Sequence, residues 1–418
     1  MTAQVTVDVA IVGGGMVGAS LAAALRDTGI EVALVEGFAP DAAAQPSFDE
    51  RTTAIGNGSR AVFEGLGVWP GMAAESGVIR AIHVSDAGRF GFARLVAAEL
   101  GLEAFGYVLP NRVIGRALWA ALESAPHLTT FVPARPVAVA VSRERAVLDV
   151  ERAGGERTRV HAALLIAADG AQSMLRAALG LPSHVEDYCQ VAVVANVAAD
   201  RRHDGTAYER FTTVGPLALL PLADGSYTVV WALAPDAAER ARSLPAAEFL
   251  AELQQRFGWR AGRFVRLGAR AAYPLALTRS DATHGERLVL IGNAAQALHP
   301  VAGQGFNLGL RDAATLAETL VAARARGDDL GSDAVLARFA EARSADRRGV
   351  TRFTDGLVKV FTDDRPGIGL ARDLGLLLFD LAPPAKQLLS RVSWGFAGRL
   401  PRLARGLALA GREESRGP

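Results

Sequence analysis

The chain has 418 residues, of which half are hydrophobic and 21% are charged, and its formal net charge is +1. This composition supports a large buried core and excludes global disorder, and the near-zero charge argues against nucleic-acid binding through phosphate neutralisation. The single cysteine, Cys189, excludes a disulfide framework and a cysteine-based metal site, and it favours a reducing, cytoplasmic compartment.

The N-terminal segment predicts a strand, a helix and a second strand. The apolar run 7–12 is typical of a strand buried on both faces, 16–28 of a helix with small packing residues, and 30–35 of another buried strand. The uncharged segment 9–25 is not expected to be a secretory or membrane segment, because it contains three consecutive glycines, Asp8 precedes it directly and it lacks a basic leader.

A glycine motif connects the first strand to the helix. Gly13 permits the tight turn, Gly15 admits a pyrophosphate close to the backbone, and Gly18 lets the helix pack against the strand. Glu36 ends the second strand, where a carboxylate can accept hydrogen bonds from an adenosine ribose. The motif therefore predicts a dinucleotide site and leaves FAD and NAD both open.

The segment 163–181 predicts a small apolar strand, a turn at Asp169-Gly170 and a helix. An Asp at a strand end, followed by Gly, can direct its carboxylate at a ligand. If this segment is considered by itself, an ordinary strand–turn–helix connection without a ligand also explains its pattern. The interval 183–283 alternates apolar and polar residues, which predicts antiparallel strands with a turn at Asp224-Gly225.

A glycine-rich loop separates the predicted strand 288–291 from a helix that we expect to begin at about Leu308. Gly303 and Gly305 would let the backbone pass against a flat ligand, and the start of the helix would place N–H groups near negative charge. A reduced flavin carries such a charge on its ring. The loop, the glycine motif and the Asp-Gly turn together indicate FAD.

The segment 366–411 is apolar and basic, with five cationic and no acidic residues from Lys386 to Arg405. Such a segment either lies on an anionic membrane face or covers the cofactor domain or a subunit interface. The sequence leaves these two interpretations open.

These motifs together resemble the FAD-dependent aromatic hydroxylases, the group A flavoprotein monooxygenases, over nearly the whole chain. Segments 207–222 and 292–312 are similar to ubiquinone-biosynthesis hydroxylases, most of all to the 2-polyprenyl-6-methoxyphenol hydroxylase branch. Asn293 contributes to that similarity, since most of the wider superfamily has Asp there. Arg51 resembles a flavin-contacting residue of the family, and Arg112 stands more loosely at the place of another.

The resemblance implies an α/β fold: a discontinuous Rossmann-type FAD-binding domain, an inserted mixed or antiparallel β-sheet substrate domain, and C-terminal helices. The FAD-binding domain is expected over 1–75, 100–182 and 284–335. The substrate domain is expected over 76–99 and 183–283, and the helical region over 336–418.

The resemblance also implies the chemistry. NADH or NADPH would bind transiently and reduce FAD, and O2 would then form a flavin C4a-hydroperoxide that hydroxylates a polyprenylated phenol. The residues expected around this chemistry are His299, Pro300, Gly303, Gln304 and Gly305. The residues expected to bind the cofactor are Gly13, Gly15, Gly18, Glu36, Arg51, Arg112, Asp169, Gly170, Gly292, Asn293, Gly303, Gly305 and Asn307.

His299 is the titratable side chain of the loop. It would either help to deprotonate the phenol or position the loop, and a lone His is a weak argument for a base. The substrate pocket is expected to include Tyr188, Tyr208, Phe211, Leu220 and Trp231, with core packing as the alternative for each.

Other functions on the same fold stay open: a flavin halogenase, a prenyl reductase, or a flavin-binding assembly subunit without turnover. No nucleic-acid partner and no metal are expected. The chain is expected in the cytoplasm, at the inner face of the membrane if the basic segment binds lipid. A homo-oligomer and membership of a ubiquinone-biosynthesis complex are both compatible with the sequence, which leaves the hydroxylated ring position, the length of the prenyl tail and the nicotinamide cofactor undecided.

Overall fold

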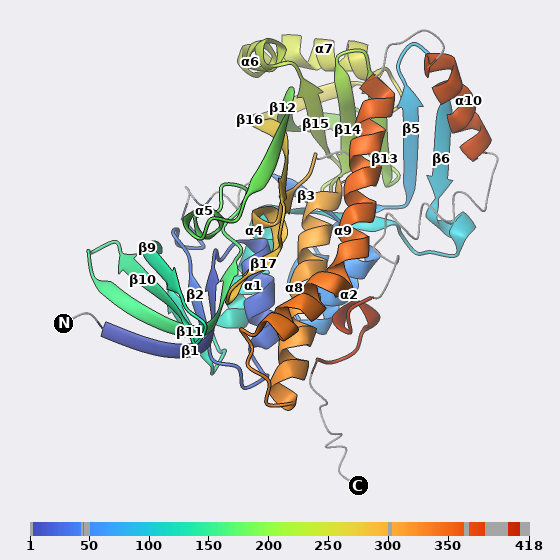
Figure 1. Ribbon diagram of the computed structural model, residues 1–418. Coiled ribbons are helices and arrows are strands. Elements are labelled where there is room, and N and C mark those ends of the chain that lie inside the picture. The colour runs from blue at the N-terminus through green and yellow to red at the C-terminus, as the bar shows by residue number, and fades with distance from the viewer. Residues whose placement is uncertain are drawn as a thin grey trace.

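The structure, a computed structural model, describes residues 3–42, 45, 51–299, 303–362, 368–380 and 400–409. Two large sheets lie at opposite ends of the molecule, with a small sheet and a group of long helices between them (Figure 1). No helix within these ranges is both long enough and apolar enough to span a membrane.

The first sheet is mainly parallel. Its strands in spatial order are β17 (His284–Gly285), β18 (Leu288–Leu290), β11 (Arg157–Ala167), β1 (Ala3–Val12), β2 (Val32–Val35) and β8 (Leu128–Phe131). The pairs from β18 to β8 are parallel. An antiparallel ribbon of β9 (Ala134–Val141) and β10 (Ala146–Arg152) joins β11.

Consecutive side chains of a strand point to opposite sides of a sheet. Both sides of the second half of β1 are covered. Val9 and Ile11 face the helices, whereas Ala10 and Val12 face the layer that includes the β9–β10 ribbon. The continuous apolar run in the sequence follows from this double burial.

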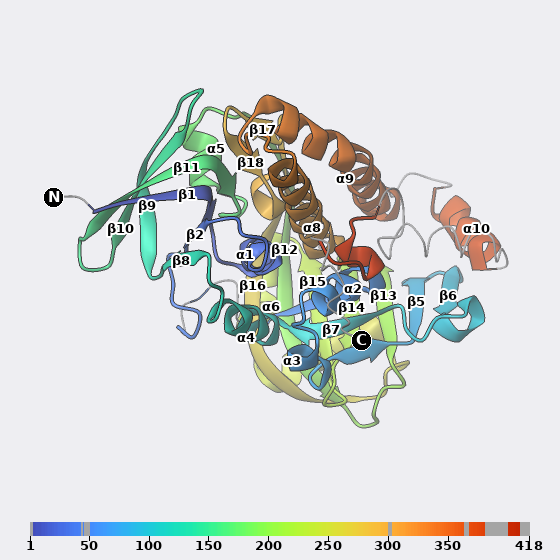
Figure 2. The ribbon, with the colours of Figure 1, turned by 90° about the horizontal axis from the view of Figure 1, so that it is seen from below.

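Helices α1 (Met16–Leu25), α4 (Asn111–Leu122) and α8 (Gln304–Ala325) pack on one side of the first sheet in a shared core. α9 (Asp333–Thr362) runs alongside α8 (Figure 2). The other helices are α2 (Asn57–Gly65), α3 (Pro70–Ala73), α5 (Met174–Ala178), α10 (Ile368–Asp380) and the short turns η1 (Ala97–Leu100), η2 (Gly292–Ala294) and η4 (Leu403–Arg405). α5 packs on the opposite side of the first sheet, and α10 lies beside β6 (Phe92–Val96).

Two helix ends differ from the sequence expectation. α1 ends at Leu25 rather than Thr28, where the Thr28 hydroxyl donates to the Leu25 carbonyl at 2.7 Å. α8 begins at Gln304 rather than near Leu308, because Gly303 adopts a left-handed conformation (φ +59°) and starts the helix directly.

The second sheet is mixed. Its strands in spatial order are β19 (Gln296–Ala297), β16 (Phe264–Ser280), β12 (Ser183–Ala199), β15 (Tyr227–Leu233), β14 (Gly215–Pro221), β13 (Thr206–Thr212), β5 (Ala81–Asp86) and β6 (Phe92–Val96). Only the β13–β5 pair of this path is parallel. The predicted turn at Asp224-Gly225 lies between β14 and β15, with Gly225 at φ +91°.

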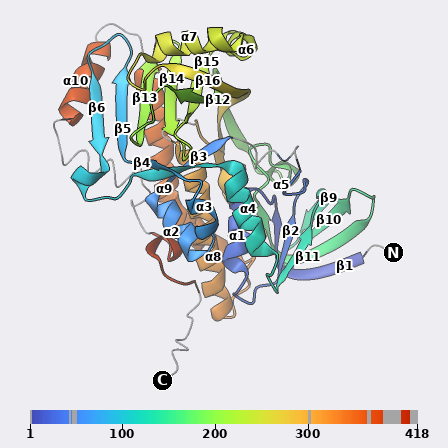
Figure 3. The ribbon, with the colours of Figure 1, turned by 180° about the vertical axis from the view of Figure 1, so that it is seen from behind.

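Helices α6 (Pro235–Ser243) and α7 (Ala246–Phe257) cover the face of the second sheet that points away from the first sheet (Figure 3). A small antiparallel sheet, β3 (Thr52–Gly56), β7 (Gly106–Pro110) and β4 (Gly77–Ile79), lies between the two large ones. The uncovered face of the second sheet therefore borders the part of the chain that carries the glycine motif.

Candidate active site

A cavity of about 870 Å³ brings the predicted motifs together. Its walls come from the β1–α1 turn, the ends of β2 and β11, strand β3, the start of α8 and strands β13 to β15. The predicted residues that line it are Gly13, Gly15, Glu36, Arg51, Asp169, Gly170, Tyr208, Leu220, Asn293, His299, Gly303, Gln304, Gly305 and Asn307. The predicted residues outside its walls are Gly18, Arg112, Tyr188, Phe211, Trp231 and Gly292. Pro300 lies outside the described residues.

The β1–α1 turn has no room for larger residues. A Cβ on Gly13, whose φ is +102°, would lie 2.4 Å from the Ala168 carbonyl oxygen, and a Cβ on Gly18 would lie 1.9 Å from the Gly13 oxygen. Gly18 therefore shapes the turn from behind without touching the cavity. Gly15 caps α1 without a side chain, so the first N–H groups of the helix are open to a phosphate.

Glu36 holds the same turn from the end of β2. Its carboxylate accepts from the Gly14 N–H at 2.7 Å and from the Phe38 N–H at 3.0 Å, one bond on each oxygen. Each oxygen keeps a lone pair for a ribose hydroxyl. The residue thus serves the turn and the cavity together.

Asp169 closes β11 and caps α5. Its Oδ2 accepts from the N–H groups of Met174 at 2.8 Å and Leu175 at 3.3 Å. Its Oδ1 is buried and has no hydrogen-bond partner among the described residues. A buried acceptor without a donor is costly in a folded protein, which indicates that a ligand supplies the donor.

Asn307 fastens the first turn of α8 to the small sheet. Its Oδ1 accepts from the Gly56 N–H at 2.9 Å and the Ser59 hydroxyl at 2.6 Å, and its Nδ2 donates to the carbonyls of Ala54 at 2.9 Å and Gly303 at 2.8 Å. All four hydrogen-bonding positions of the amide are filled by protein. The side chain therefore holds the loop, and the expected contact of Asn307 with the cofactor stays a prediction.

His299 is only 2% exposed. Its Nε2 lies 3.3 Å from Gln190 Oε1, and the Tyr188 ring stands edge-on to the imidazole at 5.0 Å. Burial lowers the pKa of His299 to about 4, so the ring is neutral at physiological pH. This packing favours positioning of the loop over proton abstraction, and it places Tyr188 behind His299 rather than in the cavity wall.

The two predicted basic residues differ in place. Arg51 lines the cavity and stacks on the Tyr273 ring at 4.5 Å. Arg112 pairs with Glu75 at 3.1 Å, partly exposed and away from the cavity. Its expected flavin contact therefore gains no support from the cavity walls and stays a prediction.

Only one face of the second sheet borders the cavity. Ala218 and Leu220 of β14 and Val230 and Ala232 of β15 line it. Trp231 points the opposite way and packs in the core under α7, since adjacent strand residues face opposite sides.

The other predicted aromatic residues are also turned away or buried. The Tyr208 ring meets Phe257 of α7 edge-on at 5.3 Å, although Tyr208 itself borders the cavity. Phe211, 4% exposed, lies towards the end of β13 and outside the lining residues. The pocket wall on this sheet is thus built mainly from small and aliphatic side chains, of which the sequence prediction included only Leu220.

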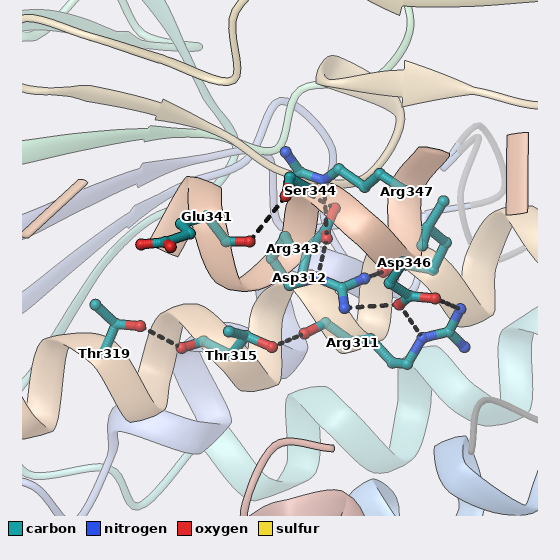
Figure 4. A network of polar contacts seen from close by, with 10 residues as sticks. Arg311, Asp312, Thr315, Thr319, Glu341, Arg343, Ser344, Asp346 and Arg347 are labelled. Carbon is teal, nitrogen blue, oxygen red and sulfur yellow. Dashed lines mark hydrogen bonds and ion pairs between the residues drawn. The ribbon is translucent and has the colours of Figure 1, made fainter. Parts of the chain in front are cut away.

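A buried ionic network fixes the position of α8 against α9 (Figure 4). Asp312 of α8 pairs with Arg343 at 2.7 Å and Arg347 at 3.0 Å, both from α9. Asp346 in turn pairs with Arg311 at 2.8 Å and Arg343 at 2.7 Å. These contacts orient Asp312, which lies in α8 more than one helical turn beyond the loop that borders the cavity.

The residues present fit an FAD molecule. The glycine turn keeps a tight backbone beside the cavity that a Cβ on Gly13 or Gly18 would force open, the Asp169 Oδ1 is a buried acceptor without a partner among the described residues, and the start of α8 faces the cavity with its N–H groups. Among the described residues no cluster of His, Cys, Asp and Glu could hold a metal ion. The site is therefore suited to an anionic, planar dinucleotide.

Comparison with known proteins decides the family. The FAD binding domain family matches residues 6–354. Ubiquinone hydroxylase UbiL of Rhodospirillum rubrum is 36% identical over 411 residues, which cover 98% of this chain and 95% of UbiL. The 3-demethoxyubiquinol 3-hydroxylase of Escherichia coli is 35% identical, over 93% of this chain and 98% of that enzyme. This chain belongs to the FAD-dependent ubiquinone hydroxylase family.

The fold of this ubiquinone hydroxylase family member is shared with more distant flavin enzymes. The p-nitrophenol 4-monooxygenase PnpA from Pseudomonas putida DLL-E4 superposes with a TM-score of 0.77 at 19% identity, over 96% of this chain and all of that one. The predicted α/β fold class, the FAD cofactor and the monooxygenase class are confirmed. The enzyme is an FAD-dependent aromatic-ring hydroxylase, and NADH or NADPH is the reductant typical of its family.

Proposed function

We propose that this hydroxylase adds a hydroxyl group to the aromatic ring of a polyprenylated phenol, a precursor of ubiquinone, with O2 and NADH or NADPH as co-substrates. The observation that supports it most is the continuity of one cavity from the dinucleotide cradle to the apolar face of β14 and β15. The names of the relatives agree with an aromatic quinone precursor.

When bound, FAD takes a hydride from the nicotinamide and transfers one oxygen atom of O2 to the ring. The residues of the chain bind the cofactor and stabilise its charge. The β1–α1 turn and α1 bind the pyrophosphate, and Glu36 accepts from the ribose. The N–H groups at the start of α8 stabilise negative charge on the ring system.

The second sheet supplies the substrate side. Its aliphatic face excludes water from the reacting atoms and holds the phenol ring near the cofactor. In this proposal the FAD-binding part comprises 1–75, 100–182 and 284–335, and the substrate part comprises 76–99 and 183–283. β5 pairs with β13 and β6 pairs with β5, so both strands belong to the second sheet, which supports that division.

A contact with the membrane is part of the proposal, because a polyprenyl tail resides in the bilayer. Phe90 and Phe92 of the β5–β6 hairpin are 56% and 38% exposed, and Leu374 and Leu378 of α10 are 48% and 67% exposed. α10 is joined to this hairpin by the hydrogen bond from the Arg94 N–H to Asp380 at 2.8 Å. The basic stretch 386–399 lies outside the described residues. Association with other enzymes of ubiquinone synthesis, or between copies of the chain, remains an extension of this proposal.

The test is rescue of ubiquinone synthesis in bacterial strains that each lack one ring hydroxylase, with the accumulated intermediates identified by mass spectrometry. Restored ubiquinone in one strain is expected, and it also identifies the ring position. Failure in every strain, with the protein present and loaded with FAD, would overturn the proposal.

A further inference from the structure

Glu209 is a carboxylate in the apolar wall of the cavity. It lies in the middle of β13, opposite Ala218 of β14 and Val84 of β5. Glu209, Ala218 and the next residue along this row, Val230, all line the cavity. Because directly paired residues share a face of the sheet, the Glu209 side chain points to the cavity rather than to α7.

The carboxylate has no hydrogen bond and no ion pair within the described part of the chain. The cationic neighbour on the same strand, Arg210, faces the other side, where it donates to the Arg256 carbonyl at 3.1 Å and to the Ser85 hydroxyl at 3.3 Å. Burial raises the pKa of Glu209 to about 7. An unpartnered acid in an apolar wall opposes folding, and such groups concentrate at functional sites.

The titratable groups that face Glu209 are few. On the cavity face, the adjacent residues of β14 and β5 are Ala218 and Val84, neither of which ionises. Across the cavity lie His299, which is neutral at physiological pH, and Arg51, which is stacked on Tyr273. The proton affinity of Glu209 is therefore governed by its own burial rather than by a charged neighbour.

We propose that Glu209 is a catalytic residue that accepts the proton of the substrate's phenol hydroxyl. This inference rests on the proposed function. Ring hydroxylation requires an electron-rich ring, and a phenolate is richer than a phenol. Glu209 borders the apolar wall that holds the ring, whereas His299 is packed against Tyr188 and is a much weaker base. A base whose pKa lies near the working pH is the most effective.

Each proton of the proposed step has a donor and an acceptor. The phenol O–H bond breaks and a carboxyl O–H bond forms on Glu209, so that the negative charge moves to the substrate oxygen. When the hydroxylated ring regains aromaticity, the same proton returns to that oxygen. The hydrogen of the substituted ring carbon leaves as a proton and is taken up by the second oxygen atom of O2, which departs as water, and Glu209 ends the cycle ionised.

The test compares Glu209→Gln and Glu209→Asp with wild type, all loaded with FAD, on 2-methoxy-6-prenylphenol as a short-chain probe. Glu252→Gln is the matched control, because Glu252 lies on α7 at the opposite side of the same sheet and pairs with Arg240. We expect Glu209→Gln to lose about 100-fold or more in hydroxylation, with more NAD(P)H consumed per product. The decline in wild-type kcat/KM below about pH 7 should be absent, and Glu209→Asp should recover part of the rate.

A second readout needs no turnover. Ultraviolet difference spectra of the bound probe should show the red shift of a phenol hydroxyl that is hydrogen-bonded to a carboxylate in wild type and in Glu252→Gln, and that shift should be absent in Glu209→Gln. An active wild type together with an unchanged rate, pH profile and spectrum in Glu209→Gln would overturn the role of Glu209. If wild type binds FAD but hydroxylates no phenol, the proposed function fails instead, so the two failures are distinguishable.

The unliganded protein offers a check on the same carboxylate. The folded-state pKa is raised from 4.5 to about 7, so the folded state binds more protons than the unfolded state in this range and loses stability as pH rises through it. Glu209→Gln should therefore melt above wild type at pH 8, with the difference shrinking towards pH 5. No difference at any pH would show that the carboxylate is not in the apolar setting on which the inference depends.

Discussion

Arg343 donates from Nε to Asp312 at 2.7 Å, and neither side chain is more than 2% exposed. The pair joins the middle of α9 to α8 behind the loop that borders the cavity. A buried charge that loses its partner cannot recover the solvation it gave up on folding. The alignment of α8, and with it the loop that faces the cofactor, therefore depends on this contact.

Asp312→Ala should lower the free energy of unfolding by about 3–5 kcal/mol, because it removes the buried carboxylate that Arg343 and Arg347 share and leaves Arg343 with Asp346 alone. It should also reduce the amount of bound flavin. Urea denaturation and flavin absorbance measure the two effects. Asp328→Ala, which removes an exposed partner of Arg326 and Arg338, is the control and should change little. Equal effects of the two substitutions would contradict the structural role of the buried pair.

Gly18→Ala should weaken FAD binding by at least about tenfold, or ~1.4 kcal/mol, although Gly18 does not line the cavity. The added Cβ would meet the Gly13 oxygen at 1.9 Å and force the turn open. Gly154→Ala is the matched control, since a Cβ there meets nothing within 4 Å. The dissociation constant can be measured by titrating the apoprotein with FAD, and an unchanged value for Gly18→Ala would rule out this account of the turn.

Asn293→Asp should keep FAD affinity within about tenfold, or ~1.4 kcal/mol. Asn293 is an exposed residue of the cavity wall, so water screens the added charge. Asp169→Asn should cost more, because that carboxylate is partly buried and caps α5. Loss of the flavin in Asn293→Asp alone would show that the neutral amide is required.

His299→Asn should remove part of the pH dependence of stability. The pKa of His299 is lowered from 6.5 to about 4, so the unfolded state binds more protons than the folded state in that range, and stability falls as pH drops from about 6.5 towards 4. The melting temperatures of wild type and variant should therefore converge or cross as the pH falls. His127→Asn, at an exposed position, should leave the wild-type dependence in place.

The sequence predicted the cofactor side of the site well, for a physical reason. A strand, three spaced glycines and a terminal Glu form a local unit, and nearly all of its requirements lie within about 25 residues of chain. The Asp169-Gly170 turn and the Gly303–Gly305 loop are local in the same sense. Residues of these three segments come together in one cavity.

The substrate side could not be predicted in the same way. In a strand, alternate residues face the same side, so either of two sets of residues could face the helices. Because both sets in β13 to β15 include apolar residues, the sequence pattern does not indicate which set packs under α7. Trp231 and the Tyr208 ring belong to the helix-covered face, whereas Glu209, which the sequence interpretation passed over, borders the cavity.

By itself, then, the sequence determined the dinucleotide cradle and the family resemblance, because short-range backbone geometry needs particular residues at particular spacings. Only the tertiary structure decided that Asn307 holds Gly56 across 251 positions of chain, that Asp312 is neutralised by α9, and that Glu209, without a partner among the described residues, lies in the apolar wall. Those outcomes depend on how distant elements pack, and packing depends on shape and burial across the whole chain rather than on any local pattern.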